Sequence, residues 1–218
     1  MVSRGINIFI LLFTVFYALT VSGQVLQEGD LLFCCAKSHN AITDVTSGVE
    51  GLPIDHVAVV HHIGGDDGPL FIIEAVKPFV HITPMDSFIV ENEDCQVLVG
   101  RVNADVVDIH KSVRRCLLQV GKPYDDLYLP GDSAVYCSEL VQLSYVDAQG
   151  ILVFEPKPMS FHDATGQVTD YWRDFYAERG MTVPEGLPGS NPGELSQRPQ
   201  LTIIDIWEHL RKTGQKKL

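Results

Sequence analysis

Two β-branched runs separated by a tight turn are the strongest constraint on how this chain folds. Residues 56–63 read HVAVVHHI and residues 70–76 read LFIIEAV, with GGDDGP between them. Apolar runs of this length on either side of a Gly- and Asp-rich turn are typical of a β-hairpin. Because strands joined by so short a turn pair antiparallel, the core is expected to contain an antiparallel sheet.

Shorter apolar runs predict the remaining strands, and helically spaced apolar residues predict the helices. Strands are expected at residues 31–34, 80–82, 96–102 and 151–154. Helices are expected at residues 36–48, 106–120, 137–145 and 203–210, with a helical turn up to Ile89 that Thr83 or Asp86 caps. Together these elements indicate an α+β fold, with helices packed on a mainly antiparallel sheet.

Residues 1–23 have the pattern of a secretory signal peptide. Arg4 precedes an apolar segment from Ile6 to Leu19, and residues 21–23 are small or short, as at a cleavage site. The alternative is an uncleaved membrane anchor, because the segment is only slightly shorter than the ~20 residues that span a bilayer. We expect cleavage and export to the periplasm or the extracellular space, with no stable membrane span afterwards.

The expected mature chain, residues 24–218, is long enough for one well-packed domain. Its segment 184–199 is dense in Pro, Gly, Ser and Asn and is expected to form a loop within a C-terminal tail rather than a second domain. Residues 24–218 hold 15 Lys and Arg against 28 Asp and Glu, a net charge of −13. So acidic a surface disfavours binding to nucleic acid and anionic membranes.

Five cysteines are present: Cys34, Cys35, Cys95, Cys116 and Cys137. An odd number in an exported chain leaves at least one thiol free or bonded to another molecule. No C-x-x-C motif occurs, which weakens a zinc-ribbon or thioredoxin interpretation. Cys116 lies on the apolar stripe of a predicted helix and is expected to be a buried thiol.

The segment 121–145 places one of these cysteines at the start of a helix. A loop rich in Pro, Gly, Asp and Tyr leads into Cys137, and an apolar-patterned segment follows it directly. At a helix start, unpaired N–H groups and the positive end of the helix dipole favour a thiolate. Cys137 is therefore a candidate nucleophile.

A cysteine nucleophile needs a base within hydrogen-bonding distance and a third group that orients the base. His56 opens the first hairpin strand, and Glu74 is a carboxylate in the apolar second strand. If the turn is centred near residues 65–66, the numbers of two residues that face each other across the hairpin sum to about 130 or 131. His56 then lies opposite Glu74 or one place away, at a cross-strand distance of about 5 Å. The register is the weak point, and Asp55 is the alternative orienting acid.

These residues predict a Cys137–His56–Glu74 triad. Cys137 would attack a carbonyl carbon, His56 would transfer the proton, and Glu74 would orient the imidazole. The backbone N–H of Cys137 could stabilise the oxyanion, with a hydroxyl from Tyr136, Tyr124 or Tyr128.

Other functions fit some of these residues. A cysteine ahead of an apolar helix is usually an inert core residue. A metal site could use His61, His62 and a cysteine, but neighbouring strand residues face opposite sides and the ligand spacing is poor. We therefore predict that the protein needs neither a metal nor an organic cofactor.

Five segments together resemble the circularly permuted NlpC-type papain-like cysteine peptidases and amidases, in the YiiX-like branch: 29–33 (GDLLF), 55–60 (DHVAVV), 73–75 (IEA), 121–125 (GKPYD) and 136–141 (YCSELV). The resemblance implies a permuted papain-like fold, a mainly antiparallel sheet or partial barrel, in which the base precedes the nucleophile along the chain. It also implies Cys137 as nucleophile, His56 as base and Glu74 as third member. Cell-wall peptides and lipid-linked acyl groups are the substrates that it suggests.

We therefore expect an exported cysteine hydrolase that cleaves an amide bond, in a peptide or cell-wall fragment, through a thioester. The alternatives are a lipid-directed acyl hydrolase or acyltransferase with the same triad, and a catalytically silent ligand-binding domain.

Overall fold

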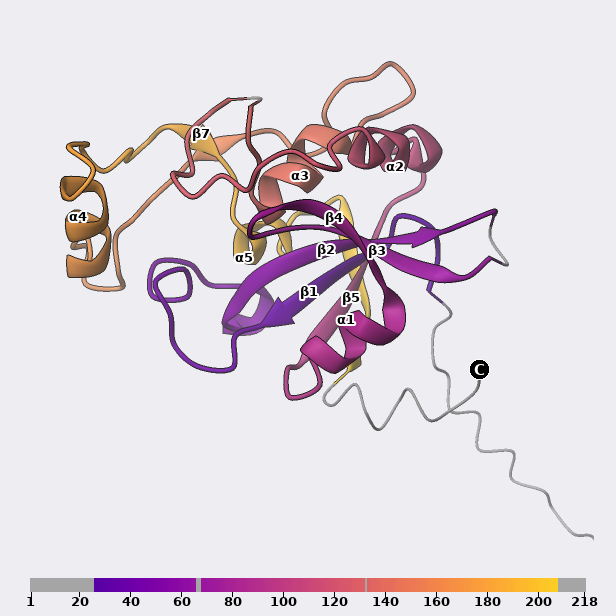
Figure 1. Ribbon diagram of the computed structural model, residues 1–218, viewed down its shortest axis with the longest axis horizontal. Coiled ribbons are helices and arrows are strands. Elements are labelled where there is room, and N and C mark those ends of the chain that lie inside the picture. Colours follow the sequence, from indigo (N-terminus) through magenta and orange to yellow (C-terminus); the bar gives the residue numbers. More distant parts are fainter. Residues whose placement is uncertain (1–25, 66–67, 132, 208–218) are drawn as a thin grey trace, which may run out of the picture.

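An antiparallel sheet forms the centre of the computed structural model, which describes residues 26–65, 68–131 and 133–207 (Figure 1). Within those residues the sheet has the strand order β4-β3-β2-β1-β5-β8, and every neighbouring pair is antiparallel. Its strands are β1 (Leu31–Cys35), β2 (Ile54–His62), β3 (Leu70–Val76), β4 (Phe79–Pro84), β5 (Val97–Val102) and β8 (Leu201–Trp207). This agrees with the predicted α+β architecture.

Helices cover both faces of the sheet. In Figure 1, α1 (Met85–Glu91) lies on one side, and α2 (Ile109–Leu117) and α3 (Cys137–Ser144) lie on the other. α4 (Asp170–Ala177) stands at one end of the molecule, away from the sheet. The smaller elements are η1 (Val49–Gly51), β6 (Lys157–Pro158), β7 (Pro188–Gly189) and α5 (Pro192–Leu195).

The central strand β1 is buried on both faces, which explains its unbroken apolar sequence. Leu31 and Phe33 pack in the core under α3, with Leu140. Leu32 points to the opposite core, which contains Phe88 of α1. Such two-sided burial leaves the ends of the strands as the places where polar side chains can meet solvent.

The hairpin of β2 and β3 is confirmed, but its predicted register was wrong. Val59 pairs with Ile73 and His62 with Leu70, so paired numbers sum to 132. The loop between β2 and β3 is longer than expected. Pro69 has no N–H and cannot donate to the ladder, and its carbonyl accepts a hydrogen bond from the Ile63 N–H. In this register Glu74 lies two residues away from the position opposite His56, and on the other side of β2 His56 pairs with Cys34 of β1.

Three other segments differ from prediction. Residues 36–48 form turns instead of a helix, because the Asn40 side chain accepts bonds from the backbone N–H groups of residues 42 and 43. Residues 151–154 contribute one isolated bridge, Val146 to Leu152, instead of a strand. Residues 201–207 form the edge strand β8 instead of a helix, consistent with their β-branched residues; residues 208–210 lie outside the described residues.

Two further details were not predicted correctly. The N-cap of α1 is Pro84, so neither Thr83 nor Asp86 caps this helix; the Thr83 hydroxyl is bonded to Glu74. α4 was not predicted at all. The predicted loop 184–199 contains β7 and the short helix α5, whose Leu195 is fully buried.

The predicted signal peptide lies outside the described residues, and export stays a prediction. None of the helices in residues 26–207 that the structure describes is long and apolar enough to cross a membrane.

Candidate active site

Cys137 is the first residue of α3, as predicted. Tyr136 at the N-cap has an extended backbone, and Cys137 is only 4% exposed. The first N–H groups of a helix have no partner inside it, so those at the start of α3 can bind an anion beside the thiol. The preceding loop, residues 121–136, is attached to the sheet because Tyr124 N–H donates to Pro78 O at 3.0 Å.

His56 and Glu74 are in direct contact despite the corrected register. A shift of two residues keeps both side chains on the same face of the sheet, and His56 Nε2 lies 2.9 Å from Glu74 Oε2. The other carboxylate oxygen accepts a 2.5 Å hydrogen bond from Thr83 Oγ1, a diagonal neighbour on β4. Glu74 is 3% exposed, so these two bonds fix a buried carboxylate.

The three groups perturb one another electrostatically. Burial by itself would lower the pKa of His56, but hydrogen bonds with Cys137 and Glu74 outweigh it and raise that pKa to about 10. Burial would raise the pKa of Glu74, but His56 and Thr83 hold it below its ordinary value. Because Nε2 of the imidazole is bonded to Glu74, Nδ1 is the nitrogen that faces Cys137.

Asp55 is not placed to orient His56. Its Oδ2 accepts a 2.6 Å hydrogen bond from Asn40 Nδ2, and burial raises the pKa of Asp55. Adjacent strand side chains point in different directions, so the Asp55 carboxylate bonds Asn40 rather than the imidazole, although both residues line the same pocket. Between the two predicted acids, the structure brings Glu74 to the imidazole.

The three candidate tyrosines differ in what their hydroxyls do. Tyr124 and Tyr128 interact electrostatically with each other and with Cys137, and burial raises the pKa of both hydroxyls, that of Tyr128 to about 12. Tyr128 has φ 52°, which turns the loop toward the site. The Tyr136 hydroxyl instead accepts a bond from Ser190 N–H at 3.1 Å. Tyr124 and Tyr128 are therefore the better oxyanion donors.

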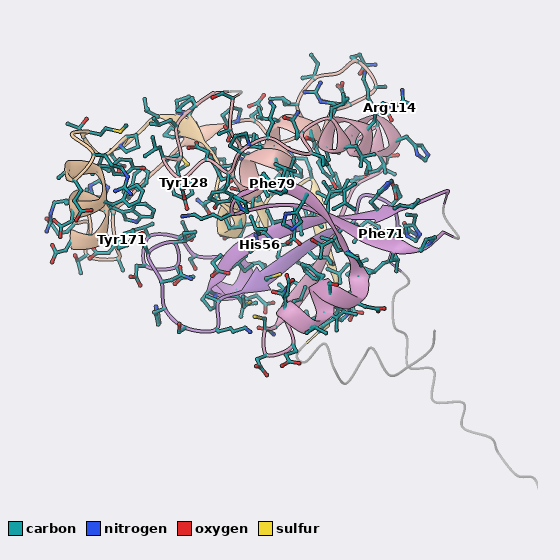
Figure 2. The ribbon with its side chains drawn as sticks, in the orientation of Figure 1. His56, Phe71, Phe79, Arg114, Tyr128 and Tyr171 are labelled. Atoms are coloured by element: carbon teal, nitrogen blue, oxygen red, sulfur yellow. The ribbon has the colours of Figure 1, made fainter. Side chains whose placement is uncertain are left out.

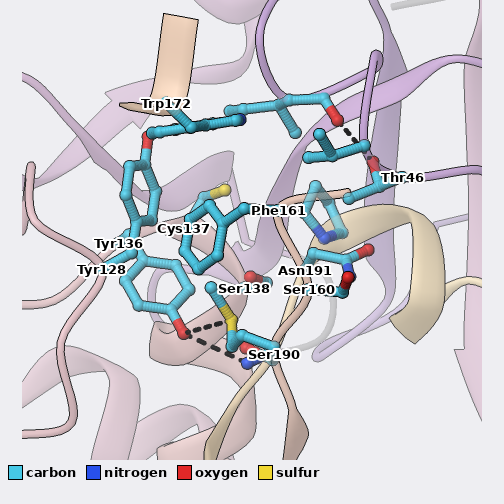
Figure 3. A pocket seen from close by; sticks show the side chains of 14 residues that line it. Thr46, Tyr128, Tyr136, Cys137, Ser138, Ser160, Phe161, Trp172, Ser190 and Asn191 are labelled. Carbon is cyan, nitrogen blue, oxygen red and sulfur yellow. Dashed lines mark hydrogen bonds between the residues drawn. The ribbon is translucent and has the colours of Figure 1, made fainter. Parts of the chain in front are cut away.

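An apolar pocket opens beside Cys137 (Figure 3). Most of its wall comes from apolar and aromatic side chains, including Ile42, Val45, Tyr128, Met159, Phe161 and Trp172. Sequence reasoning missed most of these residues, because they lie outside the motifs, in the turns of residues 36–48 and around α4.

Hydrogen bonds hold the distant segments of this pocket together. Trp172 Nε1 donates to Ala41 O at 3.0 Å, and the Tyr176 hydroxyl donates to Leu127 O at 2.9 Å. The aromatic rings of α4 thus connect the turns of residues 36–48 to the loop before Cys137. Tyr171 on the same helix points outward instead, at the far end of the molecule (Figure 2).

A second pocket lies on the other side of His56 and is acidic. Asp55, Glu74 and Glu91 supply carboxyl groups to its lining, and Lys37 supplies an ammonium group. His56 lines this pocket but not the apolar one, whereas Cys137 lines the apolar one.

All five cysteines carry free thiols. The prediction that at least one is free is confirmed, as is the burial of Cys116. Burial raises the pKa of Cys35 to about 11 and that of Cys116 to about 12, and it also raises the pKa of Cys34 and Cys95. Those four thiols are poor nucleophiles near neutral pH.

The described residues do not fit a metal centre. In residues 26–65, 68–131 and 133–207, no group of three or more His, Cys, Asp or Glu could hold an ion. His61, considered from the sequence as a ligand, has its Nδ1 2.9 Å from Glu28 Oε1, and His62 follows it on the opposite face of β2.

Known proteins are similar to this chain in sequence and in fold. A family model for permuted papain-like amidase enzymes, YaeF/YiiX, C92 family, matches residues 25–205. YiiX of Escherichia coli strain K12, described as an uncharacterized protein, is 30% identical over 137 residues, which cover 62% of this chain and 66% of YiiX, slightly under two thirds of its length. The crystal structure titled metalloprotein YiiX, from Escherichia coli O157:H7, has a TM-score of 0.65 at 24% identity and covers 82% of this chain and 96% of that one.

The structural likeness confirms the predicted permuted papain-like fold, and the family match confirms the resemblance inferred from the five segments. The strand β2 with the candidate base His56 precedes the helix α3, which begins at the candidate nucleophile Cys137. The chain therefore belongs to the C92 family of permuted papain-like amidases, the family of YaeF and YiiX.

Proposed function

We propose that this protein is a cysteine amidase in which Cys137 is the nucleophile, His56 the general acid and base, and Glu74 the group that orients His56. The observation that carries this proposal is the 2.9 Å contact of Glu74 with an imidazole that also interacts with Cys137, the first residue of α3. Family membership supports the same class of activity.

The first half of the reaction acylates the enzyme. The Cys137 thiol gives its proton to His56, the sulfur forms a bond to the carbonyl carbon, and the carbonyl π electrons move to oxygen. The N–H groups at the start of α3 and the Tyr124–Tyr128 hydroxyl pair stabilise that oxyanion. When the carbonyl re-forms, the C–N bond breaks and His56 gives its proton to the departing amine, leaving a thioester on Cys137.

The second half releases the acid. A water molecule enters the site that the amine has left, and His56 accepts its proton as the oxygen attacks the thioester carbon. The C–S bond breaks, so that the carboxylic acid leaves and the Cys137–His56 pair is restored. Glu74 stays bonded to Nε2 in both halves and stabilises the charged imidazole.

The two pockets indicate where the acyl part and the amine part of the substrate bind. The carbonyl that Cys137 attacks belongs to the acyl group, so the apolar pocket beside Cys137 receives that group. The amine departs toward His56, where the second pocket is acidic. We therefore propose an apolar acyl group or apolar amino-acid side chain on one side of the scissile bond.

The second candidate function is an acyl hydrolase or acyltransferase acting on lipids with the same three residues. The aromatic walls around Trp172 and Phe161 favour it, because they suit an alkyl chain as well as an apolar side chain. Silent binding is the weaker alternative, because the three reactive groups are assembled. The solved relative is titled a metalloprotein, but the described residues here do not fit a metal centre, so the proposed steps use side chains alone.

One experiment separates these functions. The purified protein is incubated with matched amide, ester and peptide substrates that carry the same apolar acyl group, and the acyl-enzyme is sought by mass spectrometry. We expect an acyl adduct on Cys137 and amide cleavage that is lost in C137A and H56A but kept in the matched thiol variant C116A. Turnover of the ester alone would favour the lipid-directed function, and full amide turnover by C137A would refute the amidase proposal.

We also propose that the protein is exported, and only the sequence pattern of residues 1–23 supports this. Sequencing the N-terminus of the protein from cells that express the full chain tests it, since export with cleavage removes those residues.

A further inference from the structure

Glu139 is a buried carboxyl group that the proposed chemistry does not use. It lies in the first turn of α3, two residues after Cys137, and is 5% exposed. Its Oε2 has no hydrogen-bond partner among the described residues. A buried ionised carboxylate with an unpaired oxygen is unfavourable, whereas the neutral acid carries an O–H on that oxygen which can donate.

Three titratable groups in the described part of the chain face Glu139. Asp125 and Lys122 come from the loop before α3, and Tyr136 is the N-cap of the helix, whose backbone N–H donates to Glu139. Asp125 repels a second negative charge, while Lys122 and the Tyr136 N–H favour one. The burial of Glu139 and the repulsion by Asp125 outweigh the other two and raise the pKa of Glu139 to about 8.

Two hydrogen bonds hold the Asp125 carboxylate in place. Its Oδ1 accepts the backbone N–H of Leu127 and its Oδ2 that of Leu129, each at 2.8 Å. These bonds hold the loop that contains Tyr128, and Asp125 directly follows Tyr124. The carboxyl group facing Glu139 thus organises the loop that brings both tyrosines to Cys137.

We propose that Glu139 is a neutral carboxylic acid in the first turn of α3, and that its neutrality lets the Asp125 loop, with its tyrosine pair, stay packed beside Cys137. This inference rests on the proposed function, because it assigns a positioning role within that site. Ionisation of Glu139 releases its proton to solvent and sets two carboxylates against each other. The loop then moves away from α3, and the site loses its arrangement as the pH rises.

The test measures how fast iodoacetamide alkylates Cys137 from about pH 6 to about pH 10, a range that brackets the titration of Glu139. This readout needs no substrate. Wild type is compared with E139Q, which keeps the shape of the neutral acid but cannot ionise, and with E155Q, which changes an exposed glutamate. Infrared difference spectra of wild type and E139Q at neutral pH report directly on a protonated carboxyl group.

We expect the wild-type rate to fall about threefold or more relative to E139Q as the pH rises through about 8, and the two to agree at lower pH. E155Q should follow wild type. The infrared difference should contain the carbonyl band of a protonated acid. Identical pH profiles for wild type and E139Q, or the absence of that band, would overturn the inference.

Failure of the inference can be told apart from failure of the amidase proposal. If C137A loses amidase activity while E139Q alkylates with the wild-type profile, the amidase proposal stands and the role of Glu139 is refuted. If C137A keeps activity, the amidase proposal fails, and the alkylation profiles still decide the role of Glu139.

Discussion

Replacing Glu74 with glutamine tests the contact on which the proposed catalytic site depends. The glutamine side chain has nearly the same shape and could still hydrogen-bond His56 and Thr83, but it carries no charge. The Glu74 carboxylate helps to raise the pKa of His56 to about 10. Its removal should therefore lower that pKa and destabilise the protonated imidazole in both halves of the reaction.

The size of the effect follows from the type of contact that is lost. A hydrogen bond to a charged group contributes about 1.5–3 kcal/mol. The 2.9 Å bond lies in a buried site, where solvent does not screen it. Because about 1.4 kcal/mol corresponds to a tenfold change in rate, E74Q should lose about ten- to a hundredfold in kcat/KM. The assay is hydrolysis of a fluorogenic amide with an apolar acyl group, followed across pH.

Asp55→Asn is the matched control, because it removes the carboxylate next to His56 in sequence. Asp55 bonds Asn40 instead of the imidazole, so D55N should cost less than about threefold. Thermal unfolding of both variants checks that each is folded at the assay temperature. A greater loss of activity in D55N than in folded E74Q would refute the assignment of Glu74 as the orienting acid.

The same site supports three further predictions. Cys137 should be alkylated faster than the other four cysteines near neutral pH, as measured by mass spectrometry of labelled peptides, because burial raises the pKa of each of those four. Trp172→Ala should lower kcat/KM about tenfold more for a long apolar acyl group than for an acetyl group, with Cys137 alkylation unchanged. His56 should stabilise the fold below about pH 6.5 and lose that contribution as the pH rises toward its folded pKa of about 10, so thermal melts of H56Q should vary less over that range than those of wild type.

The sequence predicted the three residues that the structure brings together, although not their exact pairing. The hairpin prediction was correct in its elements and wrong in its register, with pairs summing to 132 rather than 130 or 131. The contact between His56 and Glu74 survived because side chains alternate along a strand with a period of two. A register error of one residue would have placed Glu74 on the opposite face of the sheet. The contact was predicted only because the error was an even number of residues.

The walls of the apolar pocket could not be predicted in the same way. Trp172 reaches the backbone of Ala41, 131 residues away in the sequence. No local pattern links the two segments, since each is a short polar stretch with scattered aromatic or aliphatic residues. The turns of residues 36–48 were misassigned for a related reason, because the hydrogen bonds of the Asn40 side chain outweigh the weak helical pattern.

The chemistry and the specificity of this site come from different parts of the chain. Strands β2 and β3 and the start of α3 supply the proposed reactive groups, and His56 meets Glu74 because the start of β2 and the end of the antiparallel β3 lie at the same end of the sheet. α4 supplies aromatic walls but none of the three proposed reactive groups. Substitutions in α4 can therefore change which acyl group is accepted without moving Cys137 relative to His56. This separation explains why the reactive residues could be inferred from short motifs, whereas the substrate must be sought in the contacts of Trp172.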